Sequence, residues 1–359
     1  MTRIASCVVI CIVTIFTMVA RPSRAQFYQQ TNLASDVPGL ALNTDSNLKN
    51  PWGIAFSPTS PFWLANQSSG NSTLYNGSGA AQALVVTIPG GSPTGAVFNS
   101  TASDFVLPVG GKATFLFATL GGSIAGWNSG SVTTAQIVAT PPGAAYTGLT
   151  LGSNGTANFL YAARHGGIDV FNNTFGLTTL SGSFTDPVLP AGFSPYNIAN
   201  IGGVLYVSYE NVPAGGGVVD AFDGNGNFLQ RVSANGAGGT LASPWGMVLA
   251  PASFGSFGGD LLVGNEGDGH ISAFNPVTGQ FLGQLQKPGG GAIVNSGLWG
   301  LAFGNGGAGF DSSSLYFAAG INAETDGLFG RLTPVPEPSC CLLVGCCLAA
   351  SIGVRRRAG

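Results

Sequence analysis

Short apolar runs separated by small polar residues dominate the middle of this 359-residue chain. Typical runs of four or five residues stand at 114–118, 158–162 and 204–207, and clusters of Gly, Asn, Ser and Pro divide them. No stretch between the two ends shows the sustained apolar period of 3.6 residues that an amphipathic helix needs. The pattern therefore predicts an all-β protein with many tight turns and almost no helix.

One unit recurs along this pattern. An aromatic residue followed by glycine opens an apolar run at 50–56, and similar stretches stand at 243–249 and 297–303. Six units can be aligned, and the third apolar run of each holds an aromatic residue at a regular spacing of 44 to 55 residues: Tyr75, Trp127, Phe171, Phe222, Phe274 and Phe329. This spacing, with four strands in a unit, is typical of β-propeller blades.

The sixth unit has three apolar runs where the others have four. Residues 27–33 precede the first unit, and we expect them to supply the outer strand of the last blade, since this closes the ring and covers two strand edges. The first strand of the second blade is assigned to residues 104–107. The sequence thus predicts a six-bladed β-propeller of four-stranded antiparallel blades over residues 26–334.

The N-terminal end differs from this middle part. Arg3 precedes an apolar stretch at 4–20, and residues 23–25 match a small-x-small cleavage site. Residues 1–25 are therefore predicted to be a secretory signal peptide that is cut after Ala25. A retained N-terminal anchor is the alternative.

The C-terminal end, residues 335–359, combines three features. It holds a Pro-Glu-Pro motif, an apolar run at 340–354 and a basic tail, whose residues are Pro336, Glu337, Pro338, Arg355, Arg356 and Arg357. The apolar run is predicted to be a transmembrane helix with the arginines on the cytoplasmic side. A plain membrane anchor is the alternative to a sorting signal.

These C-terminal features resemble the PEP-CTERM sorting signal of Gram-negative bacteria. The resemblance implies processing by an exosortase-type protease, after signal peptidase has removed the leader, and display at the cell surface or outside the cell. The six units resemble NHL-repeat propellers, and residues 32–36, 44–45 and 50–58 look like a family of exported bacterial propellers without an assigned activity. The resemblances imply a fold and a location at the cell surface or outside the cell, but they imply no mechanism.

Charge and cysteine content exclude several function classes. Residues 26–335 carry six basic and fourteen acidic side chains, a formal charge of −8, so the propeller has no basic patch for nucleic acid. All six cysteines lie in the two ends, which leaves the propeller without a disulfide or a cysteine metal site: Cys7, Cys11, Cys340, Cys341, Cys346 and Cys347.

The candidate site residues follow from propeller geometry, because no motif defines them. Loops after the second and fourth strands of propeller blades open on one face around the channel, and this analogy places six polar residues there: Asn66, Arg164, His165, Glu210, Asn265 and Glu266. Glu210, Glu266 and Asn211 offer oxygen ligands that suit Ca²⁺, an arrangement that loosely resembles lactonase-like propellers. His165 and Glu210 are candidates for a general base. The alternative interpretation is that these residues are ordinary polar turns.

Two function classes remain open. The leading interpretation is an exported, surface-sorted propeller that acts as a non-catalytic binding protein, requires no cofactor, and has an extracellular polysaccharide or surface protein as its partner. The alternative is a divalent-metal-dependent, lactonase-like hydrolase that acts on a small molecule in the channel. Low charge also allows self-assembly into a surface layer. No G-x-S-x-G element or other catalytic motif decides between them.

Overall fold

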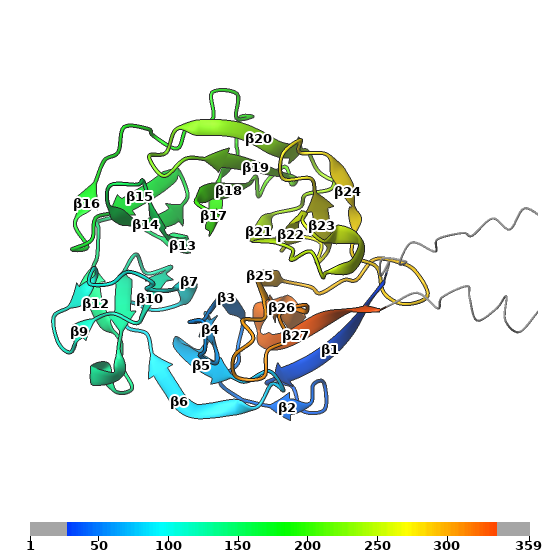
Figure 1. Cartoon of the computed structure of the whole chain (residues 1–359), viewed down its shortest axis with the longest axis horizontal. Helices are drawn as coiled ribbons and strands as arrows, with labels where there is room; N and C mark the ends of the chain where they lie inside the picture. The colour runs from blue at the N-terminus through cyan, green and yellow to red at the C-terminus, as the bar shows by residue number, and fades with distance from the viewer. Residues whose placement is uncertain (1–26, 336–359) are drawn as a thin grey trace, which may run out of the picture. The chain divides into compact units, whose positions relative to one another are not determined.

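The computed structural model describes residues 27–335, which form a six-bladed β-propeller (Figure 1). Each blade contains four antiparallel strands, and the first of them lies nearest the central axis. The strands of the first three blades are β3 (Pro51–Ala55), β4 (Phe62–Asn66), β5 (Asn71–Tyr75) and β6 (Ala81–Thr87); β7 (Pro93–Phe98), β10 (Phe115–Thr119), β11 (Ile124–Trp127) and β12 (Gln136–Ala139); and β13 (Tyr146–Ser153), β14 (Asn158–Arg164), β15 (Gly167–Phe171) and β16 (Leu177–Thr178).

The other three blades complete the ring. Their strands are β17 (Ser194–Ile201), β18 (Val204–Glu210), β19 (Gly217–Phe222) and β20 (Phe228–Asn235); β21 (Pro244–Leu249), β22 (Leu261–Asn265), β23 (Ile271–Phe274) and β24 (Phe281–Gln284); and β25 (Leu298–Phe303), β26 (Leu315–Gly320), β27 (Asp326–Val335), β1 (Phe27–Ser35) and β2 (Asn43–Thr44). Helical turns within residues 27–335 are short: η1 (Ser129–Ser131), η2 (Gly255–Phe257) and α1 (Ile321–Glu324).

The ring closes through the N-terminal strand, as the sequence predicts. β1 pairs antiparallel with β27 from Phe27 opposite Val335 to Ser35 opposite Leu328, so the two strands lie side by side in Figure 1. A salt bridge of 2.6 Å joins Asp36, just after β1, to Lys49, just before the first blade. The last blade therefore depends on residues from both ends of the propeller.

The spaced aromatic residues of the sequence repeat form the packing between blades. Five of them end the third strand of a blade, and the sixth, Phe329, lies inside β27. All six are buried, with at most 8% of Trp127 and none of the others exposed. After four of the third strands, an Asn or Asp side chain accepts main-chain hydrogen bonds in a tight turn, as at Asn76, Asn172, Asp223 and Asn275.

The second blade corrects one sequence assignment. Its inner strand is β7 (Pro93–Phe98), whereas residues 104–107 belong to an excursion between β7 and β10. Within this excursion β8 (Val106–Leu107) pairs only with β9 (Gly111–Lys112), while Phe105 packs fully buried against the core. The assignment of residues 104–107 as the inner strand is therefore wrong, because the burial of one large side chain, Phe105, also produces a short apolar run.

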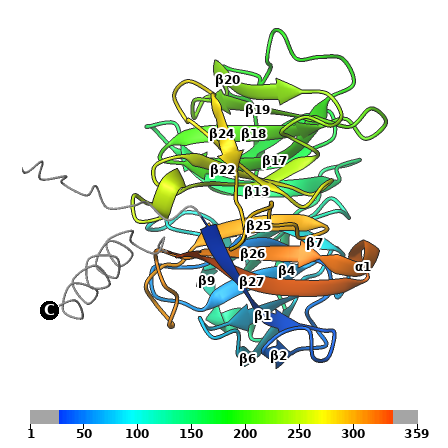
Figure 2. The same cartoon turned by 90° about the vertical axis from the view of Figure 1, so that its right-hand side faces the viewer.

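Antiparallel pairing gives the propeller two distinct faces. The inner strands begin where the second strands end, since Ser194 pairs with Glu210 and Pro244 with Asn265. The turn α1 (Ile321–Glu324) stands on this face, at the right of Figure 2. The inner strands end on the opposite face.

The predicted signal peptide, Pro-Glu-Pro motif, transmembrane helix and arginine tail all lie outside residues 27–335. Within that described part of the chain, no helix has the length and apolar character needed to cross a membrane.

Candidate functional site

Four aromatic side chains meet on the axis near the start of the inner strands. Trp52 and Trp299 stack with their ring centroids 3.6 Å apart, and Trp245 stands edge-on to both. Tyr196 completes the cluster, and none of the four is more than 7% exposed. The tryptophans of the repeated Trp-Gly step therefore form an axial core, which leaves no open aromatic surface at this point.

The residue after each of these aromatic residues lets neighbouring blades touch. A Cβ atom at Gly300 would lie 2.5 Å from the carbonyl oxygen of Trp52, and one at Gly53 would lie 2.6 Å from that of Thr94. The fourth blade has Asn197 instead, whose Nδ2 donates a 2.7 Å hydrogen bond to the carbonyl oxygen of Trp245. These close approaches fix the inner strands and the residues at their starts.

Three carboxylate side chains gather on the face where the inner strands begin, close enough to act on one another electrostatically. We define this carboxylate mouth by Glu210, Glu266 and Glu324, which come from the fourth, fifth and sixth blades. The whole chain has four glutamates, and these are the three that fall within residues 27–335. Burial first, and then the three carboxylates, raise the pKa of Tyr196 below them. The mouth therefore concentrates negative charge over the aromatic core.

Burial and mutual repulsion raise the pKa of two of these carboxyl groups. The pKa of Glu210 rises to about 7, chiefly through burial and then through repulsion by Glu266, against a lowering by a hydrogen bond with Ser243. The pKa of Glu266 also rises to about 7, through burial and repulsion by Glu324. Both carboxyl groups are thus partly protonated near neutral pH, and a bound cation would favour their charged forms.

Glu324 reaches the mouth on a left-handed turn. In α1, Asn322, Ala323 and Glu324 have φ values of 54°, 54° and 65°. This conformation costs an L-residue roughly 1–2 kcal/mol. A run of such residues persists only where the surrounding structure holds it, and strain of this kind often accompanies function.

Asn50 connects Glu324 to the aromatic core. Its Nδ2 donates hydrogen bonds to Oε2 of Glu324 at 3.1 Å and to Oε1 of Gln67 at 3.0 Å. Its Oδ1 accepts a 3.0 Å hydrogen bond from Nε1 of Trp299. Asn50 is 1% exposed, so these partners matter for its stability in the folded protein.

Three of the predicted site residues come together at the mouth. Glu210 and Glu266 are part of it, and Nε2 of His165 lies 3.4 Å from Oε1 of Glu210. The imidazole is largely exposed, whereas the carboxylate is buried. Arg164 turns instead to Asp169, with Nε 2.8 Å from Oδ1, and so leaves the mouth without a paired arginine.

The predicted asparagines have local structural roles. Asn66 is fully buried and donates to Asn71 and Thr73 within its own blade. Asn265 is equally buried and donates to the carbonyl oxygen of Thr240. Asn211 accepts a hydrogen bond from the main chain of Ala214 in its own turn. These side chains hold strand ends and turns in place.

Two residues of this region, Glu324 and Tyr196, are not among the sites predicted from the sequence. Glu324 falls outside the strand-end register because the turn after β26 inserts it there. The sequence does contain a signal for Glu324, because glutamate is rare in this chain and a rare charged residue is a reasonable candidate for a site.

The mouth does not form a ready metal site. Within residues 27–335, no three side chains of His, Cys, Asp or Glu come together in an arrangement that could hold a metal ion. Ca²⁺ needs about six to eight oxygen ligands around one point, and the three carboxylates of the mouth are not grouped closely enough to hold a metal ion.

The fold and mouth define a class: a six-bladed propeller with three carboxylates grouped on one face. Two solved structures share the fold. Virginiamycin B lyase from Staphylococcus aureus has a TM-score of 0.51 and 16% identity, over 86% of this chain and 99% of that one. A putative gluconolactonase has a TM-score of 0.52 and 14% identity, over 86% and 97% of the two chains. Identity this low shows the fold alone.

Relatives of similar length identify the family. The "Uncharacterized protein R648" of Acanthamoeba polyphaga mimivirus is 30% identical over 341 residues, which cover 87% of this chain and 82% of that protein. The "Uncharacterized protein L690" of the same virus is 30% identical over 87% of each chain. This chain belongs to the family of these two proteins. No protein-family model matches it.

Proposed function

We propose that this protein is a non-catalytic binding propeller that holds a ligand with two or more amino groups at the carboxylate mouth. The grouping of Glu210, Glu266 and Glu324 from three successive blades carries the proposal. Ammonium groups donate charge-assisted hydrogen bonds to carboxylates, and several of them can serve carboxylates that do not share one point. Binding would also relieve the repulsion that raises the pKa of Glu210 and Glu266.

Two basic side chains of the propeller are already paired with carboxylates elsewhere and do not compete with such a ligand for the mouth. Lys49 is paired with Asp36, and Arg164 is paired with Asp169. The formal charge of −8 on residues 26–335 would attract a cationic ligand and speed its encounter with the mouth.

Calorimetric titration of the full chain with spermidine tests the proposal. Saturable binding at pH 8 is expected, and either Glu210→Gln or Glu266→Gln should weaken it about tenfold, as loss of one charge-assisted hydrogen bond implies. Glu337→Gln is the matched control, because it changes the one glutamate outside residues 27–335. Absence of binding, or equal binding by the mouth variants, would contradict the proposal.

Ca²⁺ is the second candidate ligand, and with it the metal-dependent, lactonase-like hydrolase. The observation in its favour is the pair of His165 and Glu210, 3.4 Å apart, which could supply a general base. A separate titration with calcium chloride distinguishes the two ideas. Tight Ca²⁺ binding that Glu266→Gln abolishes, together with no response to spermidine, would favour the hydrolase.

We also propose that the protein is exported and sorted to the cell surface. Support comes from the sequence alone: a leader ending at Ala25, the motif Pro336, Glu337 and Pro338, the apolar run at 340–354 and the tail Arg355, Arg356 and Arg357. Signal peptidase and an exosortase-type protease would process it, and an extracellular polysaccharide or surface protein with amino groups would be its partner. Cell fractionation tests this, since replacing the three residues of the motif should retain the protein in the inner membrane.

A further inference from the structure

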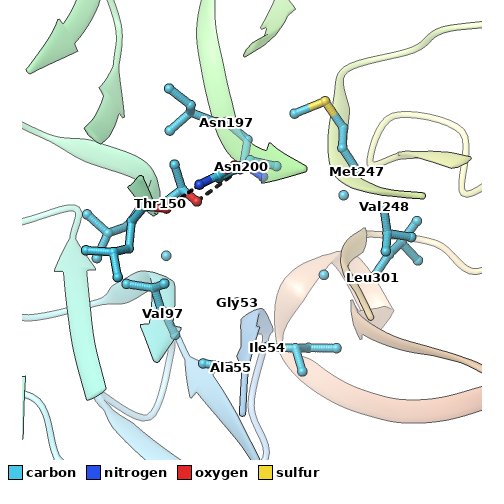
Figure 3. A pocket seen from close by; sticks show the side chains of 18 of the residues that line it. Gly53, Ile54, Ala55, Val97, Thr150, Asn197, Asn200, Met247, Val248 and Leu301 are labelled. Atoms are coloured by element: carbon cyan, nitrogen blue, oxygen red, sulfur yellow. Dashed lines mark hydrogen bonds between the residues drawn. The ribbon is translucent and has the colours of Figure 1, made fainter. Parts of the chain in front are cut away.

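The propeller has a hollow on its axis, on the face where the inner strands end. It is a cavity of about 400 Å³ that lies beyond the aromatic core, lined by the inner strands from the Trp-Gly step onward (Figure 3). Each blade contributes a half-buried apolar side chain to its wall: Ile54, Val97, Leu151, Ile201, Val248 and Leu301. Its inner end is bounded by Trp245 and the close-packed glycines of neighbouring blades.

The character of this wall is opposite to that of the carboxylate mouth. The lining contains no acidic or basic side chain. Water in such a cavity finds few hydrogen-bonding partners, and apolar cavities in proteins accept small apolar molecules instead. The volume falls in the range of about 300–1,000 Å³ that is usual for small-molecule pockets.

A buried hydroxyl group on the wall, that of Thr150, is free to donate. Oγ1 of Thr150 accepts a 3.1 Å hydrogen bond from the main-chain N–H of Asn200, and Figure 3 shows the pair across the cavity from Val248 and Leu301. Thr150 is 8% exposed, and no group within residues 27–335 accepts the proton of its own hydroxyl. A buried donor without an acceptor is costly, so a bound acceptor would stabilise it.

The amide of Asn200, by contrast, is already used. Its Nδ2 donates to the carbonyl oxygen of Leu151 at 2.8 Å, and its Oδ1 accepts from the main chain of Gly203 at 3.0 Å. Asn197, the other amide of the lining, donates to Trp245. Ser100 also lines the cavity, but it is exposed to solvent, so Thr150 is the buried side-chain donor that the wall offers to a ligand.

We propose that this cavity binds a small, uncharged, mostly apolar molecule that carries one hydrogen-bond acceptor. The six apolar side chains would exclude water from its body, and Thr150 would orient it through the acceptor. The site is separate from the carboxylate mouth, because the aromatic core of Trp52, Trp245 and Trp299 lies between them.

Prodan, an uncharged naphthalene ketone whose emission shifts to the blue in apolar surroundings, is a suitable probe. Saturable binding to the full chain is expected, with the blue shift. Because the sequence outside residues 27–335 includes apolar runs, binding to the cavity is scored as the part that a cavity variant removes.

Val248→Trp should fill the cavity and weaken prodan binding about tenfold or more. Leu249→Trp is the matched control, since Leu249 is the next residue of β21, is 43% exposed and does not line the cavity. Ala199→Phe, on the wall of the fourth blade, provides a second filling variant if Val248→Trp fails to fold. Thr150→Val should weaken binding about fivefold, as loss of one neutral hydrogen bond implies.

Prodan binding at the cavity and spermidine binding at the carboxylate mouth can be tested independently. Glu266→Gln should leave prodan binding unchanged, even if spermidine binding proves absent. Absence of saturable prodan binding by the unaltered chain would overturn the proposal. Equal binding by the folded Val248→Trp or Ala199→Phe variant would overturn it as well, because the probe would then sit elsewhere.

Discussion

The indole N–H of Trp299 donates a 3.0 Å hydrogen bond to Oδ1 of Asn50, across the junction between the last blade and the first. Asn50 has a φ of 45°, which asparagine tolerates better than most residues. Asn50→Leu should lower the free energy of unfolding by about 3 kcal/mol, because it leaves a buried donor unpaired and strains the backbone. Chemical denaturation measures this change.

Asn50→Gly separates the two contributions. Glycine adopts a φ of 45° without strain, so this variant should cost about 2 kcal/mol, from the lost hydrogen bonds and the greater freedom of glycine in the unfolded chain. If both variants unfold within about 0.5 kcal/mol of the unaltered chain, Asn50 does not join the blades in the way described.

Relief of strain in the turn that carries Glu324 should stabilise the protein. Ala323 has a φ of 54° in α1 (Ile321–Glu324), a conformation that glycine adopts without steric strain. Ala323→Gly should raise the free energy of unfolding by about 0.5–1 kcal/mol, the relief being partly offset by the greater freedom of glycine in the unfolded chain. Ala323→Val should lower it, because a branched side chain suits this conformation less well. A lower melting temperature for the glycine variant would show that the turn is not strained.

Stability should depend on pH through the carboxylate mouth. Glu210 and Glu266 have pKa values of about 7, above the ordinary value of 4.5, so the folded protein binds their protons more tightly than the unfolded chain does. Their contribution therefore favours folding at low pH and is lost as pH rises from about 4.5 to about 7. Asp220, whose pKa burial also raises to about 7, acts in the same direction.

Glu266→Gln isolates this effect from other titrating groups. The variant should melt above the unaltered chain at pH 8, and the difference should vanish near pH 4.5, where the unaltered carboxyl group is also neutral. Differential scanning calorimetry at several pH values gives the comparison. A difference that does not change with pH would place its cause in packing.

Most of the fold could be predicted because its determinants are local and repeated. The Trp-Gly step at residues 52–53, 245–246 and 299–300 marks three inner strands, and the missing run in the last unit correctly called for closure by β1 (Phe27–Ser35). The step fails in the second blade, where Thr94 and Gly95 lack an aromatic residue. The inner strand there was consequently missed.

The site was harder to predict because it depends on long-range geometry. The positions of residues at the ends of second strands predicted Glu210 and Glu266 as site residues. The same positions also predicted Asn66 and Asn265, whose side chains instead form local structural hydrogen bonds. Glu324 depends on a left-handed turn that no propensity predicts. The apolar cavity likewise results from six strands meeting, so no single run of sequence reveals it.

Proton release on binding tests the central claim, that the carboxylate mouth holds a cationic ligand. At pH 7 the carboxyl groups of Glu210 and Glu266 are partly protonated, while the amino groups of spermidine already carry their charge. Calorimetric titration of the full chain in two buffers of different ionisation enthalpy should therefore show release of about 0.5–1 proton per bound spermidine. The Glu210→Gln, Glu266→Gln double variant should release none. Absence of binding, or binding that releases no proton and survives the double substitution, would contradict the claim.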